Sequence, residues 1–275
     1  MSSEVKAALI AESGPTDKGR LGRPKELWRR RLLPVAALVG ISLTWLLVVA
    51  VFAIPEYIVP SPIHVLRTFY RDFPTLMTNL APTAVESILG FLLGNLASIL
   101  VAIVFVHHKT VEHAFFPLAI IVRSIPIVAV APILVLMLGN DMRPKIAIAA
   151  LICFFPTLVN MVRGLESVNP QAMELMRILS ASQWEVFFKL RLYNSLPYLF
   201  AALKIAASAS VIGAIVGEWI GSTSGLGALI IIATYNFDAA LLYAAVLSAC
   251  LLSVSFTYAI GYLERRFLKW APATQ

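Results

Sequence analysis

The stretch "NPQAMELMRILSASQWEVFFKLRLYNSLP", residues 169–197, carries several charged residues in a chain that is otherwise largely apolar. Asn169 followed by Pro170 predicts a helix start, because the Asn side chain can cap the first amides and proline suits the first helical position. Ser182 and Glu185 have the S-x-x-E spacing of a capping box, which predicts the start of a second helix. We therefore expect two short helices, separated by a sharp turn, between two apolar segments.

Both expected helices have an apolar side. The first carries Met173, Met176 and Leu179 at helical spacing, and the second carries Phe187 and Leu190. Methionine and aromatic side chains suit the groove of a partner protein. The same faces would also suit a helix that rests on lipid. These residues alone leave both readings open.

The surrounding chain has the composition of an integral membrane protein. Of its 275 residues 59% are hydrophobic and 13% are charged, and the mean hydropathy is +0.84. A bilayer crossing takes roughly 20 apolar residues. Pro126, Pro132 and Pro156 interrupt the third and fourth of the apolar runs. We predict an all-α integral membrane protein with about six transmembrane helices, over residues 33–54, 86–106, 114–138, 145–163, 197–220 and 239–263.

The distribution of basic residues predicts the orientation. Sixteen of the 22 lysines and arginines fall in the segments that would share a side with both termini, namely 1–32, 107–113, 163–196 and 264–275. Four fall on the other side: Arg67, Arg71, Arg143 and Lys145. Basic segments remain cytoplasmic, so both termini and the paired helices are expected there. Basic side chains facing the anionic cytoplasmic leaflet then account for the net charge of +7, and nucleic-acid binding is not needed to explain it.

These predictions divide the chain into five parts. They are a basic cytoplasmic tail over 1–32, a first span over 33–54, a periplasmic connection over 55–85, a core of five spans over 86–265 that contains the paired helices within 164–197, and a cytoplasmic tail over 266–275.

Small residues recur four apart on two of the predicted spans. Gly213, Gly217 and Gly221 form a G-x-x-x-G-x-x-x-G row on the fifth span, and Gly90 and Gly94 begin a similar row on the second. Such rows let helix backbones approach closely in membranes. We expect helix packing at these positions rather than direct contact with a solute.

Four charged residues lie within or beside the predicted spans: Glu86, Arg123, Lys204 and Glu218. Charge at membrane depth needs a partner, a water-filled cavity or an interface. Arg123 and Glu218 are the candidates for lining a translocation path or for forming a buried pair. Lys204 and Glu86 could equally reach an interface.

The chain offers little for enzymatic or metal chemistry. Cys153 and Cys250 lie far apart in two apolar runs and are expected to be packing residues. The segment "HHKTVEH", 107–113, is expected to be a solvated turn rather than a zinc site. The sequence contains no phosphate-binding G-x-x-x-x-G-K-[ST] motif and none of H-E-x-x-H, G-x-S-x-G or C-x-x-C. We therefore predict no catalytic residue, no metal and no cofactor.

The charged segment resembles the "EAA" coupling loop of bacterial ABC importer permeases, whose pattern is E-A-A, three residues, G, nine residues and I-x-L-P. Glu174 stands at the acid, Ser180 at the glycine, and Leu196 with Pro197 at the closing pair. Leu175 and Met176 replace the two alanines. Because a residue other than glycine limits left-handed backbone geometry, Ser180 raises two alternatives, a reshaped turn or an unusual partner ATPase.

Further stretches are similar to the nitrate, sulfonate and taurine branch of that family. They are "IVPSPIHVLRTF", "VRSIPIVAVAPILVLMLGN", "FFPTLVNMVRGLESVNP", "VGEWIGSTSGLGALI" and "LERRFLKW". The resemblance implies the type I ABC importer permease fold, with the cytoplasmic coupling loop between spans four and five.

The resemblance also implies partners. Two permease chains, expected to be a homodimer within the lipid of a bacterial inner membrane, would form the path. An ABC ATPase would dock on the coupling loop, and a periplasmic solute-binding protein would deliver the solute. The residues expected at the ATPase are Glu174, Arg177, Leu179, Ser180, Ala181, Ser182 and Trp184.

The resemblance leaves several solutes as alternatives. Permeases of this kind move nitrate, sulfonates, taurine or bicarbonate, and related ones move thiamine-precursor pyrimidines or riboflavin. The few cationic residues in the spans argue weakly against a path for an anion. The main alternative is a transporter driven by an ion gradient, for which internally repeated broken spans are typical, and no convincing repeat is seen. A scaffold or receptor subunit is the third reading.

Overall fold

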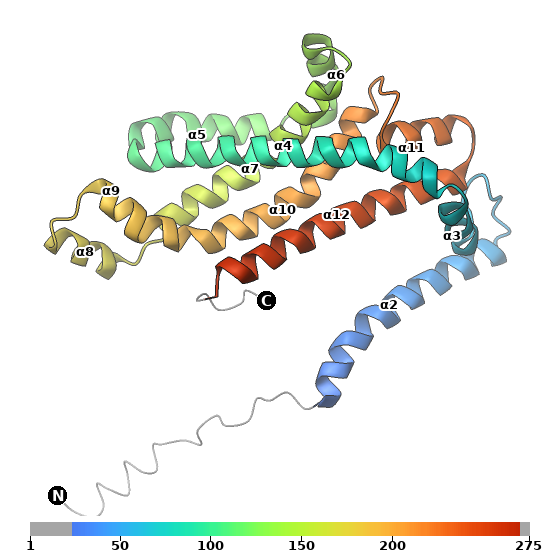
Figure 1. Cartoon of the computed structure of the whole chain (residues 1–275), viewed down its shortest axis with the longest axis horizontal. Helices are drawn as coiled ribbons and strands as arrows, with labels where there is room; N and C mark the ends of the chain where they lie inside the picture. Colours follow the sequence, from blue (N-terminus) through green and yellow to red (C-terminus); the bar gives the residue numbers. More distant parts are fainter. Residues whose placement is uncertain (1–23, 270–275) are drawn as a thin grey trace, which may run out of the picture. The chain divides into compact units, whose positions relative to one another are not determined.

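The computed structural model of the chain describes residues 24–269, and these are helical with no strand (Figure 1). The helices are α2 (Pro24–Val51), α3 (Pro62–Arg71), α4 (Phe73–His107), α5 (Lys109–Arg123), α6 (Ile127–Leu138), α7 (Met142–Glu166), α8 (Pro170–Ile178), α9 (Gln183–Val186), the π-helical turn η1 (Phe187–Arg191), α10 (Leu192–Glu218), α11 (Leu226–Tyr235) and α12 (Ala239–Phe267). Five helices are long and apolar enough to cross a bilayer, and six if the bent pair α5–α6 counts as one span. The all-α membrane fold predicted from sequence is confirmed.

The chain divides into two units, residues 1–54 and 55–275. In the first unit, α2 contains the apolar segment Leu32–Val51. Its helix begins at Pro24, so the last part of the expected tail over 1–32 is helical. The rest of that tail, and residues 270–275 of the C-terminal one, lie outside the described residues.

In the second unit, α4, α7, α10 and α12 form a bundle of long helices (Figure 1). The helices α8 and α9 lie at one end of the bundle, and α3 and α11 lie at the opposite end. Two helices overrun the expected spans, since α4 begins at Phe73 instead of residue 86, and helical structure leading into α10 begins at Gln183 instead of residue 197. Apolar runs mark the part of a helix that crosses hydrocarbon, whereas hydrogen bonding continues into the polar turns beyond it.

Small residues set the contact of α7 with its two neighbours. A Cβ atom added at Gly90 or Gly94 of α4 would overlap Ala149 or Ala150 of α7. A Cβ added at Gly213 of α10 would lie 2.7 Å from the Ala149 Cα atom. The backbones of α4, α7 and α10 therefore approach at distances that only glycine allows.

The glycine row of the fifth span is shorter than predicted. Gly217 still faces α7, where an added Cβ would lie 2.9 Å from the Lys145 Cα atom. Gly221, however, follows the end of α10 at Glu218 and has φ +73°. Its carbonyl oxygen accepts a hydrogen bond from Asn140 Nδ2 at 2.6 Å. The assignment of Gly221 to the helical row is wrong, because the residue belongs to a turn with left-handed backbone geometry.

The third predicted span is broken. Helices α5 and α6 meet at 98° across the residues Ser124 to Pro126. Pro126 has no amide to continue the helix, and it disfavours helical geometry in the residue before it. Pro132 and Pro156 remain inside α6 and α7. Only one of the three prolines thus creates a break.

Candidate functional site

The loop between α7 and α10 folds into two short helices, as the sequence predicts. Asn169 Oδ1 accepts a hydrogen bond from the Gln171 amide at 2.9 Å and caps α8. Ser182 Oγ accepts from the Glu185 amide at 3.2 Å, and Glu185 Oε2 accepts from the Ser182 amide at 2.9 Å. Both the helix start at Asn169 and the capping box of α9 are confirmed.

The turn between the two helices has the backbone geometry of a glycine position. Ser180 has φ +51°, in the left-handed region. The Ser180 amide donates to Arg177 O at 2.9 Å, and the Ala181 amide donates to Met176 O at 3.0 Å, so the end of α8 is closed by hydrogen bonds. Serine at this position thus adopts the left-handed geometry that glycine favours. The turn keeps its left-handed residue at a cost of about 1 kcal/mol relative to glycine.

The paired helices present an apolar surface to the outside of the chain. We call α8, the turn after it and α9, residues 170–186, the coupling loop surface. Its residues Leu179 and Trp184 are 65% and 60% exposed, and Ile178 is 79% exposed. Among the expected docking residues, Ala181 is half-buried in the turn, whereas Glu174, Arg177, Ser180 and Ser182 are exposed. Large exposed apolar side chains grouped in this way are typical of an interaction surface.

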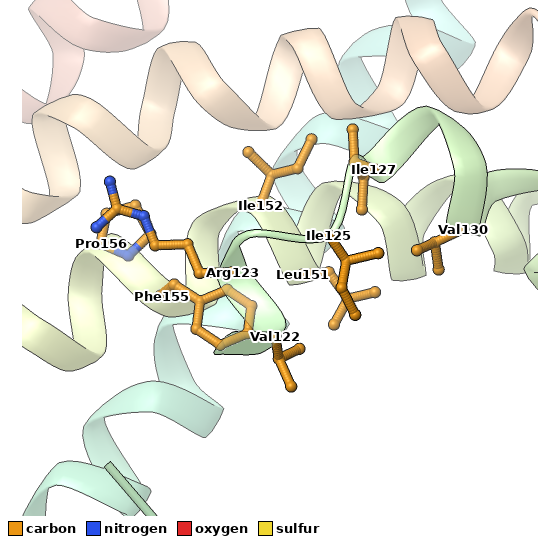
Figure 2. A pocket seen from close by; sticks show the side chains of 9 residues that line it. All are labelled: Val122, Arg123, Ile125, Ile127, Val130, Leu151, Ile152, Phe155 and Pro156. Atoms are coloured by element: carbon orange, nitrogen blue, oxygen red, sulfur yellow. The ribbon is translucent and has the colours of Figure 1, made fainter. Parts of the chain in front are cut away.

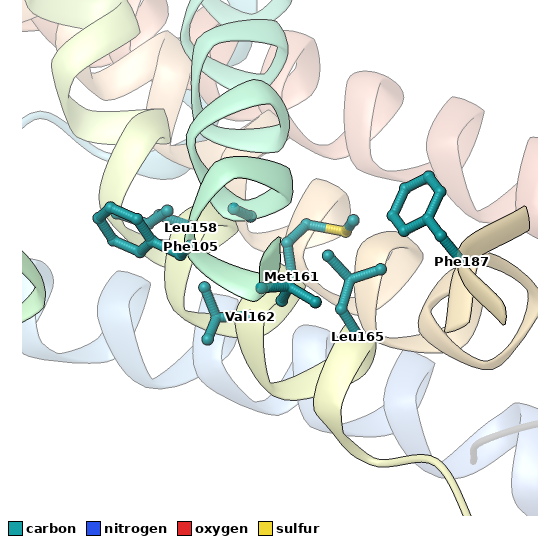
Figure 3. Close-up of a cluster of buried hydrophobic side chains, with 8 residues drawn as sticks. Phe105, Leu158, Met161, Val162, Leu165 and Phe187 are labelled. Carbon is teal, nitrogen blue, oxygen red and sulfur yellow. The ribbon is translucent and has the colours of Figure 1, made fainter. Parts of the chain in front are cut away.

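The base of this surface is tied to the bundle. Phe187 is buried with Phe105 of α4 and with Leu158, Met161 and Leu165 of α7 (Figure 3). This cluster joins η1 to two long helices through packed side chains.

Two further contacts hold the loop in place. The His107 ring at the end of α4 lies 5.1 Å from the Trp184 ring, between centroids. Asn194 Nδ2 donates to Ser167 O at 2.7 Å and closes the neck of the loop. The sequence did not mark His107 or Asn194 for this role, because both act on residues distant in the chain.

A cavity of about 390 Å³ lies where α5 breaks into α6 against α7 (Figure 2). Its lining is apolar except for Arg123, which ends α5. Phe155 supplies an aromatic ring, and Pro156 lies beside it in α7. The other lining residues are Val122, Ile125, Ile127, Val130, Leu151 and Ile152. An apolar cavity with one polar side chain in its lining is a common form of small-molecule site.

Glu218 does not line this cavity and does not pair with Arg123. It is 1% exposed. Its Oε1 atom accepts a hydrogen bond from Thr83 Oγ1 at 2.6 Å, and its Oε2 atom accepts from the Gly227 amide at 2.6 Å. Of the two alternatives for these residues, the buried Arg123–Glu218 pair is wrong, because Glu218 ends α10 facing α4 and α11.

The carboxylate of Glu218 belongs to a set of caps on α11. The first amides of a helix lack partners within it and carry partial positive charge, which favours an anion there. Gly225, at the N-cap, has φ +110°, and a Cβ atom on it would overlap the carboxylate of Glu218. The amides and their acceptors are Gly225 N with Asn79 Oδ1 at 3.1 Å, Leu226 N with Thr83 Oγ1 at 2.8 Å and Gly227 N with Glu218 Oε2 at 2.6 Å.

Two lysines also differ from expectation. Lys145, assigned from sequence to an outer connection, is 5% exposed in the first turn of α7. Its Nζ atom donates to Ser222 Oγ at 2.7 Å and lies 3.4 Å from Glu86 Oε1. Lys204, for which an interface was one alternative, pairs with Glu264 near the end of α12 at 2.9 Å. Helix packing brings together partners that lie 59 or more residues apart, which no local pattern shows.

Comparisons with known proteins agree with this architecture. The profile of the family described as "Binding-protein-dependent transport system inner membrane component" matches residues 94–269. A "Probable ABC transporter permease protein" of Haemophilus influenzae is 34% identical, covering 86% of this chain and 98% of that protein. A crystal structure of an amino acid ABC transporter shares the fold, with a TM-score of 0.56 and 16% identity, covering 73% of this chain and 97% of that one.

Two similar proteins have names that state a solute. The formylaminopyrimidine transport permease protein ThiX of Halalkalibacterium halodurans is 35% identical, covering 78% of this chain and 86% of that protein. The riboflavin transport system permease protein RibX of Chloroflexus aurantiacus is 30% identical, covering 88% of this chain and 91% of that protein.

Proposed function

The chain belongs to the family of inner membrane components of binding-protein-dependent transport systems, and from this premise we propose that it imports a small heteroaromatic solute through a path beside Arg123. It is a multi-pass permease subunit of an ATP-driven ABC importer, and a separate ABC ATPase hydrolyses the ATP. A solute-binding protein is its other partner. The comparisons support this role and not a transporter driven by an ion gradient.

The observation that carries the docking proposal is the exposed apolar coupling loop surface on a buried base. We assign ATPase docking to its exposed Leu179 and Trp184, to the turn at Ser180, Ala181 and Ser182, and to the charges of Glu174 and Arg177. An apolar helical face flanked by charge suits a groove on a partner protein. Closure of the ATPase would pull on α9, and the Phe187 cluster would transmit that pull to α4 and α7.

The cavity at the α5–α6 break is our candidate for the solute path. Broken helices occur at membrane depth where they line a cavity. Phe155 can stack on a planar ring, and the Arg123 guanidinium can donate to a carbonyl or an anionic group on it. This combination fits a pyrimidine or a similar heterocycle better than a small inorganic anion. The solutes named for two related permeases have such rings.

We further propose that two copies of the chain assemble with both termini in the cytoplasm. In the single chain, α5 has no buried residue and α6 buries only Ala131. A second copy would cover part of these apolar helices, and lipid would cover the rest. The orientation rests on the excess of lysine and arginine on the side of the coupling loop. The burial of Lys145 reduces the opposing basic charge further.

The test uses the tagged full-length chain, purified in mild detergent from its native host, with co-eluting proteins identified by mass spectrometry. Ala181→Asp adds a charge in the docking turn. The matched control, Thr223→Asp, adds the same charge at an exposed position in the loop between α10 and α11. We expect a near-stoichiometric ABC ATPase with wild type and control, and none with Ala181→Asp. Retention of the ATPase by Ala181→Asp would refute the docking assignment.

A further inference from the structure

Two carboxyl groups and one amino group are buried together between three long helices. Glu86 of α4 is 0% exposed, Glu218 of α10 is 1% exposed, and Lys145 of α7 is 5% exposed. If all three groups were ionised, the cluster would carry a net charge of −1. An uncompensated charge inside a protein or a membrane is strongly unfavourable. The N-terminus of α11 offsets only about half a charge at Glu218, so the cluster still favours one more positive charge.

The hydrogen bonds show which carboxyl group lacks a partner. Both oxygens of Glu218 accept hydrogen bonds, from Thr83 and from the Gly227 amide. Neither oxygen of Glu86 has a hydrogen-bond partner. Lys145 Nζ lies 3.4 Å from Glu86 Oε1, and it donates its hydrogen bond to Ser222 at 2.7 Å. Glu86 is thus a fully buried carboxyl group whose oxygens accept no hydrogen bond, although Oε1 lies 3.4 Å from the Lys145 ammonium.

The neighbours of Glu86 narrow the choice of ligand. Lys145 faces Glu86 at 3.4 Å. Thr83, one turn before Glu86 on α4, donates to Glu218, so Glu218 lies on the same side of α4 as Glu86. Two carboxylates have only acceptor atoms, whereas a protonated carboxyl group has an O–H donor. Residues 24–269 contain no group of three or more His, Cys, Asp or Glu side chains that could hold a metal ion. The ammonium of Lys145 would also repel a second cation.

We propose that Glu86 is a proton-binding site, and that its proton forms a hydrogen bond to the ionised carboxylate of Glu218. The cluster then consists of one carboxylic acid, one carboxylate and one ammonium group and is neutral as a whole. Each of the three buried groups has a counterpart in this arrangement.

The proton has a structural consequence at one end of the bundle. Glu218 must remain an anion to cap α11, and Lys145 holds the preceding loop through Ser222. Loss of the proton from Glu86 would place a second negative charge beside Glu218 and push the cap away from α11. The bound proton thus holds the start of α11 against α4 and α10. This inference does not depend on the solute or on the ATPase.

Infrared spectroscopy of the purified full-length chain tests the proposal directly. A buried protonated carboxyl group gives a carbonyl stretching band that an ionised carboxylate lacks. We expect this band in wild type and its loss in Glu86→Gln, in which Glu218 and Lys145 balance one another. The control Glu56→Gln removes an exposed carboxylate and should leave the band unchanged. Absence of the band from wild type, or its persistence in Glu86→Gln, would overturn the proposal.

Thermal unfolding in detergent gives a second readout. The amide of Glu86→Gln is neutral and can donate to Glu218, as the protonated acid does, so its unfolding midpoint should match that of wild type. Glu86→Ala removes the donor and should unfold at a lower temperature. If Glu86 were ionised and paired with Lys145, Glu86→Gln would also lose the ion pair and show a lowered midpoint. That result would contradict a bound proton, and the infrared test stands even where Glu86→Ala does not fold.

Discussion

Adding one methyl group at Gly94 or at Gly261 should change the stability of the chain in opposite directions. At Gly94, the new Cβ atom would overlap the backbone of Ala150, which cannot rotate away as a side chain would. At Gly261, in α12, nothing lies within 4 Å of the new atom. Both positions are helical, so both gain the same intrinsic helix preference from alanine.

The magnitudes follow from these two contributions. Replacing glycine by alanine in a helix stabilises it by about 1 kcal/mol, which is the whole effect expected for Gly261→Ala. Overpacking a close contact costs up to about 3 kcal/mol, so Gly94→Ala should be destabilised by about 2 kcal/mol net. The two variants should therefore differ by about 3 kcal/mol in the free energy of unfolding.

The assay is equilibrium unfolding of the purified chain in mild detergent, followed by tryptophan fluorescence and circular dichroism. Wild type and both variants are compared under the same detergent, with helical content measured before unfolding. Equal or greater stability of Gly94→Ala relative to wild type would refute the close approach of α4 and α7. A strong loss at Gly261→Ala would show that this face of α12 is covered in the purified protein.

Three further outcomes are expected. Glu218→Gln should lower the free energy of unfolding by about 2 kcal/mol, because the anionic cap of α11 is lost. If this variant instead keeps its stability and shows an altered solute preference in competitive uptake, Glu218 lines the solute path. The Ser180→Gly variant should co-purify with the ATPase, whereas Ser180→Val should not, because φ +51° excludes a β-branched residue. Equal ATPase binding by both variants would contradict the left-handed turn. Arg123→Gln should reduce solute uptake about tenfold, because a charged hydrogen bond to the solute is lost, while ATPase binding remains intact. If the variant takes up solute at the wild-type rate, the solute path does not pass Arg123.

Local features of this chain could be predicted because neighbours in sequence determine them. The cap at Asn169 and the capping box of Ser182 and Glu185 are contacts over two or three residues. The membrane spans follow from runs of apolar residues, whose burial in lipid depends on composition and length. The coupling loop could also be recognised, since its charged residues and helix-capping residues interrupt an otherwise apolar sequence.

Part of the candidate site was only partly predictable. Pro126 was one of three prolines noted in the third and fourth apolar runs, and nothing in the sequence distinguished it or predicted the 98° bend between α5 and α6. The charge of Glu218 in an apolar segment showed that it needs a partner, but not which one. The sequence therefore placed Arg123 and Glu218 together, in a path lining or a buried pair, and the structure separates them.

Contacts between distant helices depended on the packing of the whole bundle. Thr83 caps an amide 143 residues away at Leu226. Lys145 reads as an outer basic residue until its helix is placed against Glu86. The sequence thus determined the helix caps of the loop over 169–197, how apolar the spans are and where that charged loop interrupts them, because those properties depend on neighbouring residues. Which charged side chains meet was decided by the glycine contacts between α4, α7 and α10. These contacts set how far each helix is rotated and shifted along its axis, and the distance between two side chains depends on both helices.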